Sequence, residues 1–364
     1  MNTRSIVSLA LAVLALGCSG AEQDQPPGQE TAEVPADAAP ESFGTIERHD
    51  PRLDAILSPD AVVERATTGF SWVEGPVWAT DGSLFFSAIH GNSIQRWVPG
   101  EGVSTFLEPS GYQGEEPYGG PEPGSNGLTM DPDGRLVVAG HARRVVYRLE
   151  SLDPDAQVTV LADSYEGRPF NSPNDLVYKS DGALYFTDPP YGLPTQGDED
   201  PLKEQPVNGV YRLAGAASIP AGAEPDESAL ELIISDLTRP NGIAFSPDEQ
   251  YLFVGISDRA NLVWMRYEVQ PDGSVANGSV FLSAEGASGG GAPDGIKFDQ
   301  AGNLYGSGPG GLWIISPEGT HLGTVLLPER ASNCAWGGPD GQTLYITASS
   351  SVYSIRTNIP GVMP

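Results

Sequence analysis

Residues 239–253 read RPNGIAFSPDEQYLF. Within this segment, an amide residue, Asn241, is followed by the small Gly242 and a short apolar run. The segment then turns at Asp248-Glu249 and continues with a second apolar run. Two short apolar runs joined by a turn predict a pair of antiparallel strands. Because the same order recurs elsewhere in the chain, we expect it to define a repeating structural unit.

Five further turns mark this unit, each followed by an apolar run. They are Asp81-Gly82, Asp133-Gly134, Asp181-Gly182, Ala301-Gly302 and Asp340-Gly341. Eight residues before the second turn residue, every unit has an acidic or amide side chain. These are Glu74, Asn126, Asn174, Asn241, Asp294 and Asn333. Six strand-rich units of about fifty residues predict an all-β fold, a six-bladed β-propeller.

The N-terminal region has a different composition. Residues 1–17 carry a single Arg followed by an apolar run, which predicts a secretory signal peptide. Residues 18–45 are rich in Pro, Ala, Glu and Gln, and we expect a disordered acidic tether there. The propeller domain is predicted to occupy residues 46–364.

The residues around Cys18 resemble a bacterial lipoprotein processing site, Ala15-Leu16-Gly17-Cys18. The resemblance implies cleavage before Cys18 and lipidation of its thiol. Ser19 favours the outer membrane, so we expect an exported protein anchored to the periplasmic face of that membrane. Ordinary secretion into the periplasm is the alternative.

The charge excludes two classes of partner. The chain has 48 acidic and 19 basic residues, a formal net charge of −29. Binding to nucleic acid or to anionic lipid needs basic clusters, so we expect neither, and the lipid anchor is the only predicted membrane contact. An acidic chain suits a protein that carries a divalent cation. The sequence makes no prediction about the oligomeric state.

The six polar residues of the repeat form the candidate site. If the strand that follows each of them lines the propeller axis, two carboxylates and four amides converge at one mouth of the central channel. Calcium binds six to eight oxygen ligands, which this set can supply. No His or Cys stands in the set, so zinc and copper are poor candidates, whereas another divalent cation such as magnesium is an alternative. A purely structural polar cap is the other interpretation.

Several stretches between residues 70 and 350 resemble the gluconolactonase branch of the senescence-marker-protein-30 family. They are residues 74–78 (EGPVW), 126–129 (NGLT), 171–176 (NSPNDL), 186–192 (FTDPPYG), 239–248 (RPNGIAFSPD) and 293–295 (PDG). The resemblance implies a six-bladed propeller with one axial divalent cation, usually calcium. It implies four metal ligands: Glu74, Asn174, Asn241 and Asp294.

The resemblance also implies an activity, the calcium-dependent hydrolysis of a sugar lactone such as gluconolactone to its aldonic acid. The metal would polarise the carbonyl group and the attacking water. We assign proton abstraction to Asp294, with metal ligation alone as the alternative. Some family members have a substrate-contacting Arg two residues before the position of Asn174, but this chain has Ser172 there.

Four residues are predicted to contact the substrate: Asn126, His141, Asn174 and Tyr191. His141 could instead be a loop histidine bonded to backbone, and Tyr191 could belong to a rigid turn. Two other functions stay open, a hydrolase of phosphotriesters or other esters and a non-enzymatic binding propeller stabilised by calcium. The sequence has no Gly-x-Ser-x-Gly motif, which argues against a serine hydrolase.

Overall fold

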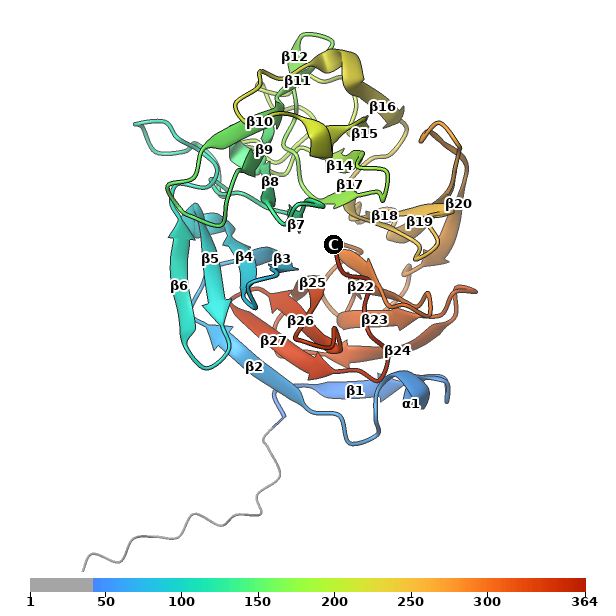
Figure 1. Ribbon diagram of the computed structural model, residues 1–364. Helices are drawn as coiled ribbons and strands as arrows, with labels where there is room; N and C mark the ends of the chain where they lie inside the picture. Colours follow the sequence, from blue (N-terminus) through green and yellow to red (C-terminus); the bar gives the residue numbers. More distant parts are fainter. Residues whose placement is uncertain (1–41) are drawn as a thin grey trace, which may run out of the picture. The chain divides into compact units, whose positions relative to one another are not determined.

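The computed structural model describes residues 42–364, which form the six blades of a β-propeller (Figure 1). The predicted signal peptide (1–17), Cys18 and most of the predicted tether (18–45) lie outside these residues. The last tether residues already contact the propeller, since the Phe43 amide donates to the Val63 carbonyl at 2.8 Å. Among residues 42–364, no helix has the length and apolarity needed to cross a membrane.

Each blade is an antiparallel sheet whose strands follow one another from the axis outward. Blade 1 contains β3 (Val73–Trp78), β4 (Leu84–Ala88), β5 (Ser93–Val98) and β6 (Gly102–Leu107). Blade 2 contains β7 (Leu128–Met130), β8 (Leu136–Gly140), β9 (Val145–Leu149) and β10 (Val158–Ala162). Blade 3 contains β13 (Leu176–Tyr178), β14 (Leu184–Asp188), β15 (Gly209–Leu213) and β16 (Leu230–Ile234).

The second half repeats this arrangement. Blade 4 contains β17 (Pro240–Phe245), β18 (Tyr251–Ile256), β19 (Val263–Val269) and β20 (Val275–Ser283). Blade 5 contains β21 (Ile296–Phe298), β22 (Leu304–Gly308), β23 (Gly311–Ile315) and β24 (His321–Leu326). Blade 6 contains β25 (Ala331–Gly337), β26 (Thr343–Ala348) and β27 (Ser351–Arg356). The short helix α1 (Leu53–Ile56) and the hairpin of β11 (Ser164–Tyr165) and β12 (Arg168–Pro169) lie outside the blades.

The ring is closed by the N-terminal part of the described chain. Strand β2 (Val63–Thr68) pairs antiparallel with β27 and completes blade 6. Strand β1 (Thr45–Arg48) pairs with β24 at the outer edge of blade 5. Figure 1 shows this closure as blue strands beside the red strands of the C-terminal blades. The pairing leaves no gap between the first and the last blade.

The six predicted turns are confirmed. In each, the second turn residue has a positive φ and its amide bonds to the carbonyl three residues before it. Five of these residues are glycines, for which a positive φ costs little. In the fourth unit Glu249 has a φ of 55°.

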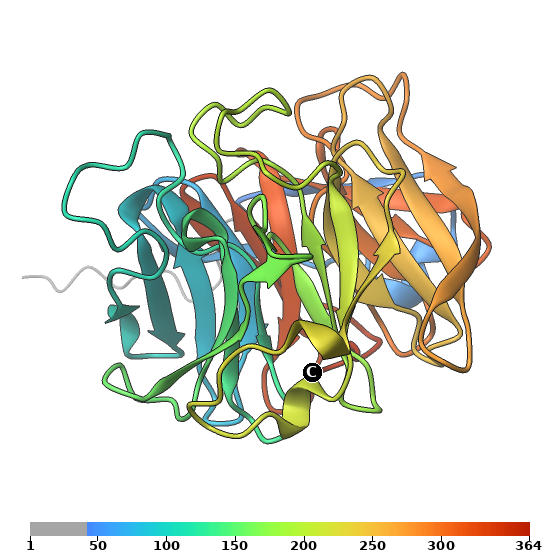
Figure 2. The ribbon, with the colours of Figure 1, turned by 90° about the horizontal axis from the view of Figure 1, so that it is seen from above.

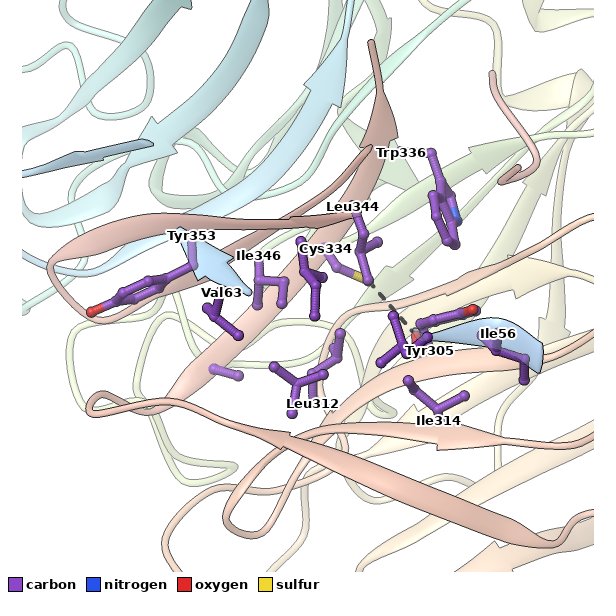
Figure 3. Close-up of a cluster of buried hydrophobic side chains, with 14 of the residues drawn as sticks. Ile56, Val63, Tyr305, Leu312, Ile314, Cys334, Trp336, Leu344, Ile346 and Tyr353 are labelled. Atoms are coloured by element: carbon purple, nitrogen blue, oxygen red, sulfur yellow. Dashed lines mark hydrogen bonds between the residues drawn. The ribbon is translucent and has the colours of Figure 1, made fainter. Parts of the chain in front are cut away.

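The hydrophobic core consists of six clusters, each between neighbouring blades. Figure 3 shows the cluster between blades 5 and 6, where Tyr305 and Leu312 face Cys334 and Leu344. Cys334 is fully buried there, as expected of a small apolar side chain, and burial raises the pKa of its thiol to about 12.

The blades approach closely at the axis. A Cβ atom added to Gly75 would lie 2.3 Å from the Asn126 carbonyl oxygen, and one added to Gly242 would lie 2.0 Å from that of Asp294. These glycines follow Glu74 and Asn241, so polar residues of neighbouring units come together around the axis. Figure 2 shows long loops in teal, yellow-green and orange rising from one face of the propeller.

Candidate active site

A cavity of about 660 Å³ opens where the inner strands begin. Six of the seven predicted site residues in the described chain line it. They are Glu74, Asn126, Asn174, Tyr191, Asn241 and Asp294. Residues far apart in the sequence therefore meet in one place, because five of the six units bring their polar residue to the same end of the inner strand.

Backbone and side-chain contacts orient the proposed ligands. The Glu74 carboxylate accepts the amide of Gly75 at 3.0 Å. The backbone N–H of Asn174 donates to the backbone carbonyl of Thr187 at 2.8 Å, in the neighbouring strand β14. Asn241 donates its side-chain Nδ2 to the Ser257 hydroxyl at 2.8 Å, which leaves its Oδ1 to accept a bond or to bind a cation.

The two carboxylates of the site repel one another. Glu74 is only 2% exposed, and burial followed by the charge of Asp294 raises its pKa well above the ordinary value. Burial also raises the pKa of Asp294, and the charges of Asp175 and Glu122 raise it further. Arg330 opposes this shift in the pKa of Asp294. Two desolvated like charges at one cavity need a cation or protons to balance them.

The residues present fit a divalent cation with oxygen ligands. Within residues 42–364, no group of three or more His, Cys, Asp or Glu side chains is arranged to hold a metal ion. The amide oxygens of Asn174 and Asn241 would therefore have to complete a set begun by Glu74 and Asp294. Two carboxylates and neutral oxygens suit Ca²⁺ in charge and in chemistry.

Asp175 lies outside the cavity lining but close to it. Its side chain is buried and its Oδ2 is 3.8 Å from Nζ of Lys297, so its charge has a partner of its own. Its Oδ1 also accepts the amide of Leu176 at 2.9 Å. The side chain of Asn333, the sixth polar residue of the repeat, accepts the amide of Cys334 at 2.8 Å, as expected of a structural cap.

Tyr191 reaches the cavity from the loop that follows β14. Burial, with the charge of Asp294 next, raises the pKa of its phenol to about 12. The loop is held by Ser172, whose hydroxyl donates to the Pro189 carbonyl at 2.5 Å and accepts the Gly192 amide at 2.8 Å. Ser172 thus positions the segment that carries Tyr191.

His141 is the predicted site residue that the cavity does not reach. Its side chain is 0% exposed. Its Nε2 lies 3.0 Å from Oε2 of Glu122, a residue that does line the cavity. The structure therefore places His141 behind Glu122, so any influence on a bound substrate passes through that carboxyl group.

Sequence reasoning missed several lining residues. They are Trp72, Glu122, Gln196, Ser257, Arg259 and Arg330. All lie outside the aligned positions of the repeat, so spacing gave no signal for them. One local signal exists, because Pro121-Glu122-Pro123 fixes the backbone on both sides of an acidic residue.

Trp72 is unusual in its backbone. It has a φ of 55°, which is rare for a bulky side chain. The guanidinium of Arg330 lies 5.6 Å from the centre of its indole ring. Together these two residues form one wall of the cavity beside Glu74. Residues with a strained backbone, such as Trp72, concentrate at functional sites.

Comparison with known proteins identifies a family and several proteins that are similar to this chain. The family described as SMP-30/gluconolactonase/LRE-like region matches residues 72–350. A gluconolactonase from Zymomonas mobilis is 41% identical over 331 residues, covering 88% of this chain and 88% of its own. The solved structure of a gluconolactonase from Xanthomonas campestris has a TM-score of 0.73 and 31% identity, covering 89% of this chain and 99% of its own. A calcium-binding regucalcin from Agrobacterium tumefaciens is similar in fold, with a TM-score of 0.60, 15% identity, and coverage of 82% of this chain and 95% of its own.

Proposed function

The chain belongs to the SMP-30/gluconolactonase/LRE-like family, and on this premise we propose that it hydrolyses a sugar lactone such as gluconolactone to the aldonic acid with the help of calcium. It is a gluconolactonase-like hydrolase of carboxylic esters. The observation that carries the proposal of a cation is the cavity itself, where the buried Glu74 and the Asp294 carboxylate repel one another beside amide side chains.

Glu74, Asn174, Asn241 and Asp294 would hold the ion through oxygen atoms. A bound divalent cation supplies charge that polarises a lactone carbonyl and acidifies a coordinated water. Binding would also balance the two carboxylates, whose pKa values are raised by burial and by neighbouring acidic side chains. Calcium is the first choice because every donor is oxygen, and another divalent cation is the alternative.

The remaining roles belong to side chains of the cavity. Asp294 accepts a proton from the attacking water, which is general base catalysis. Tyr191 keeps its proton at neutral pH, since its pKa is about 12, and donates a hydrogen bond to a substrate oxygen. Asn126 and Asn174 bind further oxygens of the substrate. Ligation alone is the alternative role for Asp294.

The activity is tested by following acid release from D-glucono-1,5-lactone by the full chain in a pH-stat, with spontaneous hydrolysis subtracted. We expect turnover that a chelator abolishes and Ca²⁺ restores. A panel of other sugar lactones, an aryl ester and a phosphotriester then identifies the substrate class. Turnover that survives complete removal of divalent ions would contradict the metal assignment, and turnover of the phosphotriester alone would contradict the substrate assignment.

We also propose that the protein is exported and lipidated at Cys18, a residue outside the described part of the chain. The sequence pattern around Cys18 supports this. Mass spectrometry of the full chain expressed in a bacterial host should find lipid on Cys18, and Cys18→Ser should move the protein from the membrane fraction to the soluble fraction. Equal partitioning of the two proteins would contradict the anchor.

A further inference from the structure

Glu122 is held at the edge of the cavity by two side chains. Its Oε1 accepts a hydrogen bond from Nε2 of Gln196 at 2.8 Å, and its Oε2 lies 3.0 Å from Nε2 of His141. The Glu122 side chain is 16% exposed, into the cavity that it lines, whereas His141 is fully buried. The carboxyl group therefore faces the cavity on one side and a buried imidazole on the other.

The imidazole cannot turn away from this contact. The Nδ1 of His141 lies 3.2 Å from the carbonyl oxygen of Pro173. A Cβ atom added to Gly192 would lie 2.7 Å from Cδ2 of His141, so the loop backbone packs directly on the ring. His141 is thus fixed between Pro173, Gly192 and Glu122.

These contacts require a proton between Glu122 and His141. A carbonyl oxygen only accepts hydrogen bonds, so Nδ1 carries a proton and donates it to the Pro173 carbonyl. The Nε2 contact then contains either an imidazolium N–H donating to a carboxylate or a carboxylic acid donating to a neutral imidazole. In both forms the pair holds one further proton. Because Glu122 lines the cavity, it can transfer this proton to a group bound there.

Glu122 and Asp294 occupy different sides of the same cavity. Glu122 lies in the connection between β6 and β7, before blade 2, whereas Asp294 precedes β21 of blade 5. In a ring of six blades, the second and the fifth are opposite one another. The two side chains still interact electrostatically, because the charge of Glu122 raises the pKa of Asp294. A substrate in the cavity would have one acidic side chain on each side.

We propose that Glu122, positioned by His141, is the general acid that protonates the ring oxygen of the lactone as it leaves. The proposal rests on the lactonase function proposed above. Water attacks the carbonyl carbon and forms a C–O bond, and one of its protons goes to Asp294. The bond from that carbon to the ring oxygen breaks, and the ring oxygen takes the proton of the Glu122–His141 pair to become a hydroxyl. The proton on Asp294 passes to solvent and the pair regains one from solvent, so each turnover consumes one water.

The leaving group provides the test. D-glucono-1,5-lactone expels an alkoxide that needs a proton, whereas dihydrocoumarin, also a lactone, expels a phenolate that does not. For Glu122→Gln we expect kcat on gluconolactone to fall about 100-fold, within the range of general acid catalysis, with KM changed less than about threefold. On dihydrocoumarin we expect kcat to fall less than about fivefold. Glu116→Gln, which alters an exposed carboxylate of the same loop, is the matched control and should behave like the wild type.

The variant His141→Asn tests the positioning role. It should lose less activity on gluconolactone than Glu122→Gln, with the same sparing of dihydrocoumarin, because Glu122 stays in place without its proton partner. A merely structural role for either residue would lower turnover of both lactones equally. Equal losses on the two substrates, or a change in KM alone, would overturn the proposal.

The activity of the wild type on the two lactones decides how the experiment continues. If the wild type hydrolyses neither lactone, the proposed function fails, and the general acid fails with it. If the wild type hydrolyses only gluconolactone, Glu122→Ala is assayed with added acetate. Acceleration of this variant by the small acid, absent in the wild type, supports the role of Glu122, and no acceleration overturns it.

Discussion

At the scale of single residues, the site depends on two carboxylates that the fold forces together. Burial, followed by the charge of Asp294, raises the pKa of Glu74. Burial also raises the pKa of Asp294, together with the charges of Asp175 and Glu122. Such an arrangement is unfavourable on its own, and removing one of the two charges relieves it. Removing one carboxylate should therefore stabilise the protein while lowering its activity. A residue with a purely structural role would not show these opposite effects.

The variant Asp294→Asn tests this separation. We expect kcat on gluconolactone to fall at least about 100-fold, because the proton acceptor and one proposed ligand are lost. The melting temperature of the metal-free protein should stay the same or rise, because one of two neighbouring like charges is gone. A pH-stat and calorimetry measure the two effects, with the exposed Asp236→Asn as control. A variant that simply unfolds would contradict the catalytic assignment.

A second residue, Asp188, should make the stability of the protein depend on pH. It accepts the amides of Asn171 and Ser172 at 2.8 and 2.7 Å and so orients the segment before Asn174. Burial raises its pKa from 3.8 to about 7. The folded protein favours the protonated form of Asp188. The contribution of this group to the free energy of unfolding is therefore complete below about pH 4 and is lost as the pH rises through 7.

We therefore expect the free energy of unfolding to fall by up to about 4 kcal/mol between pH 4 and pH 8 through this group alone. Asp188→Asn cannot ionise, so its profile should lack this decline. Urea unfolding across the pH range measures both proteins. Parallel profiles for the wild type and the variant would contradict the assigned shift.

At the scale of elements, the inner strands begin where neighbouring blades touch. Gly242 at the start of β17 leaves no space for a side chain, since a Cβ atom would meet the Asp294 carbonyl oxygen. This contact joins the beginning of blade 4 to that of blade 5. The same small residues that allow the contact therefore also set the spacing of the polar side chains around the axis.

Gly242→Ala should accordingly be destabilising. We expect a loss of at least about 2 kcal/mol, because the clash is with backbone that cannot move away easily. Gly119→Ala is the control, since there an added Cβ atom meets nothing closer than 3.9 Å. Denaturant unfolding compares the two. Equal stability of both variants would contradict the tight contact of the blades at the axis.

Local patterns were sufficient for the repeat and its turns and for six of the residues that line the cavity. The six predicted turns form as expected, because a turn and the strands beside it are encoded within a few residues. Glu122 was not predictable, because its place in the cavity is set by contacts with His141, which follows β8, and with Gln196, in the loop that follows β14. The same contacts explain why His141, predicted to touch substrate, lies behind a carboxyl group instead.

At the scale of the whole described chain, the ring is held closed by pairing between its two ends. Strand β2 hydrogen-bonds to β27, and Val63 of β2 is fully buried in the cluster between blades 5 and 6. Without β2, strand β27 would present an unpaired edge and the cluster would be open to water. The closure therefore contributes to the stability of every blade, and with it to the site.

Removing the segment that contains β1, α1 and β2 should abolish cooperative folding. A variant that begins at Gly69 is compared by calorimetry with one that begins at Ser42. We expect a sharp transition only for the longer protein and aggregation of the shorter one. A sharp transition at the same temperature in both would show that the closing strand is dispensable.

The central claim is that oxygen-bearing side chains from separate blades bind one cation at the propeller axis. Isothermal titration of Ca²⁺ into the chelator-treated full chain tests this directly. We expect one ion per chain for the wild type and a loss of affinity of at least about 100-fold in Glu74→Gln, which removes one of the two charges that attract the ion. Binding of equal strength by the wild type and Glu74→Gln would contradict the claim.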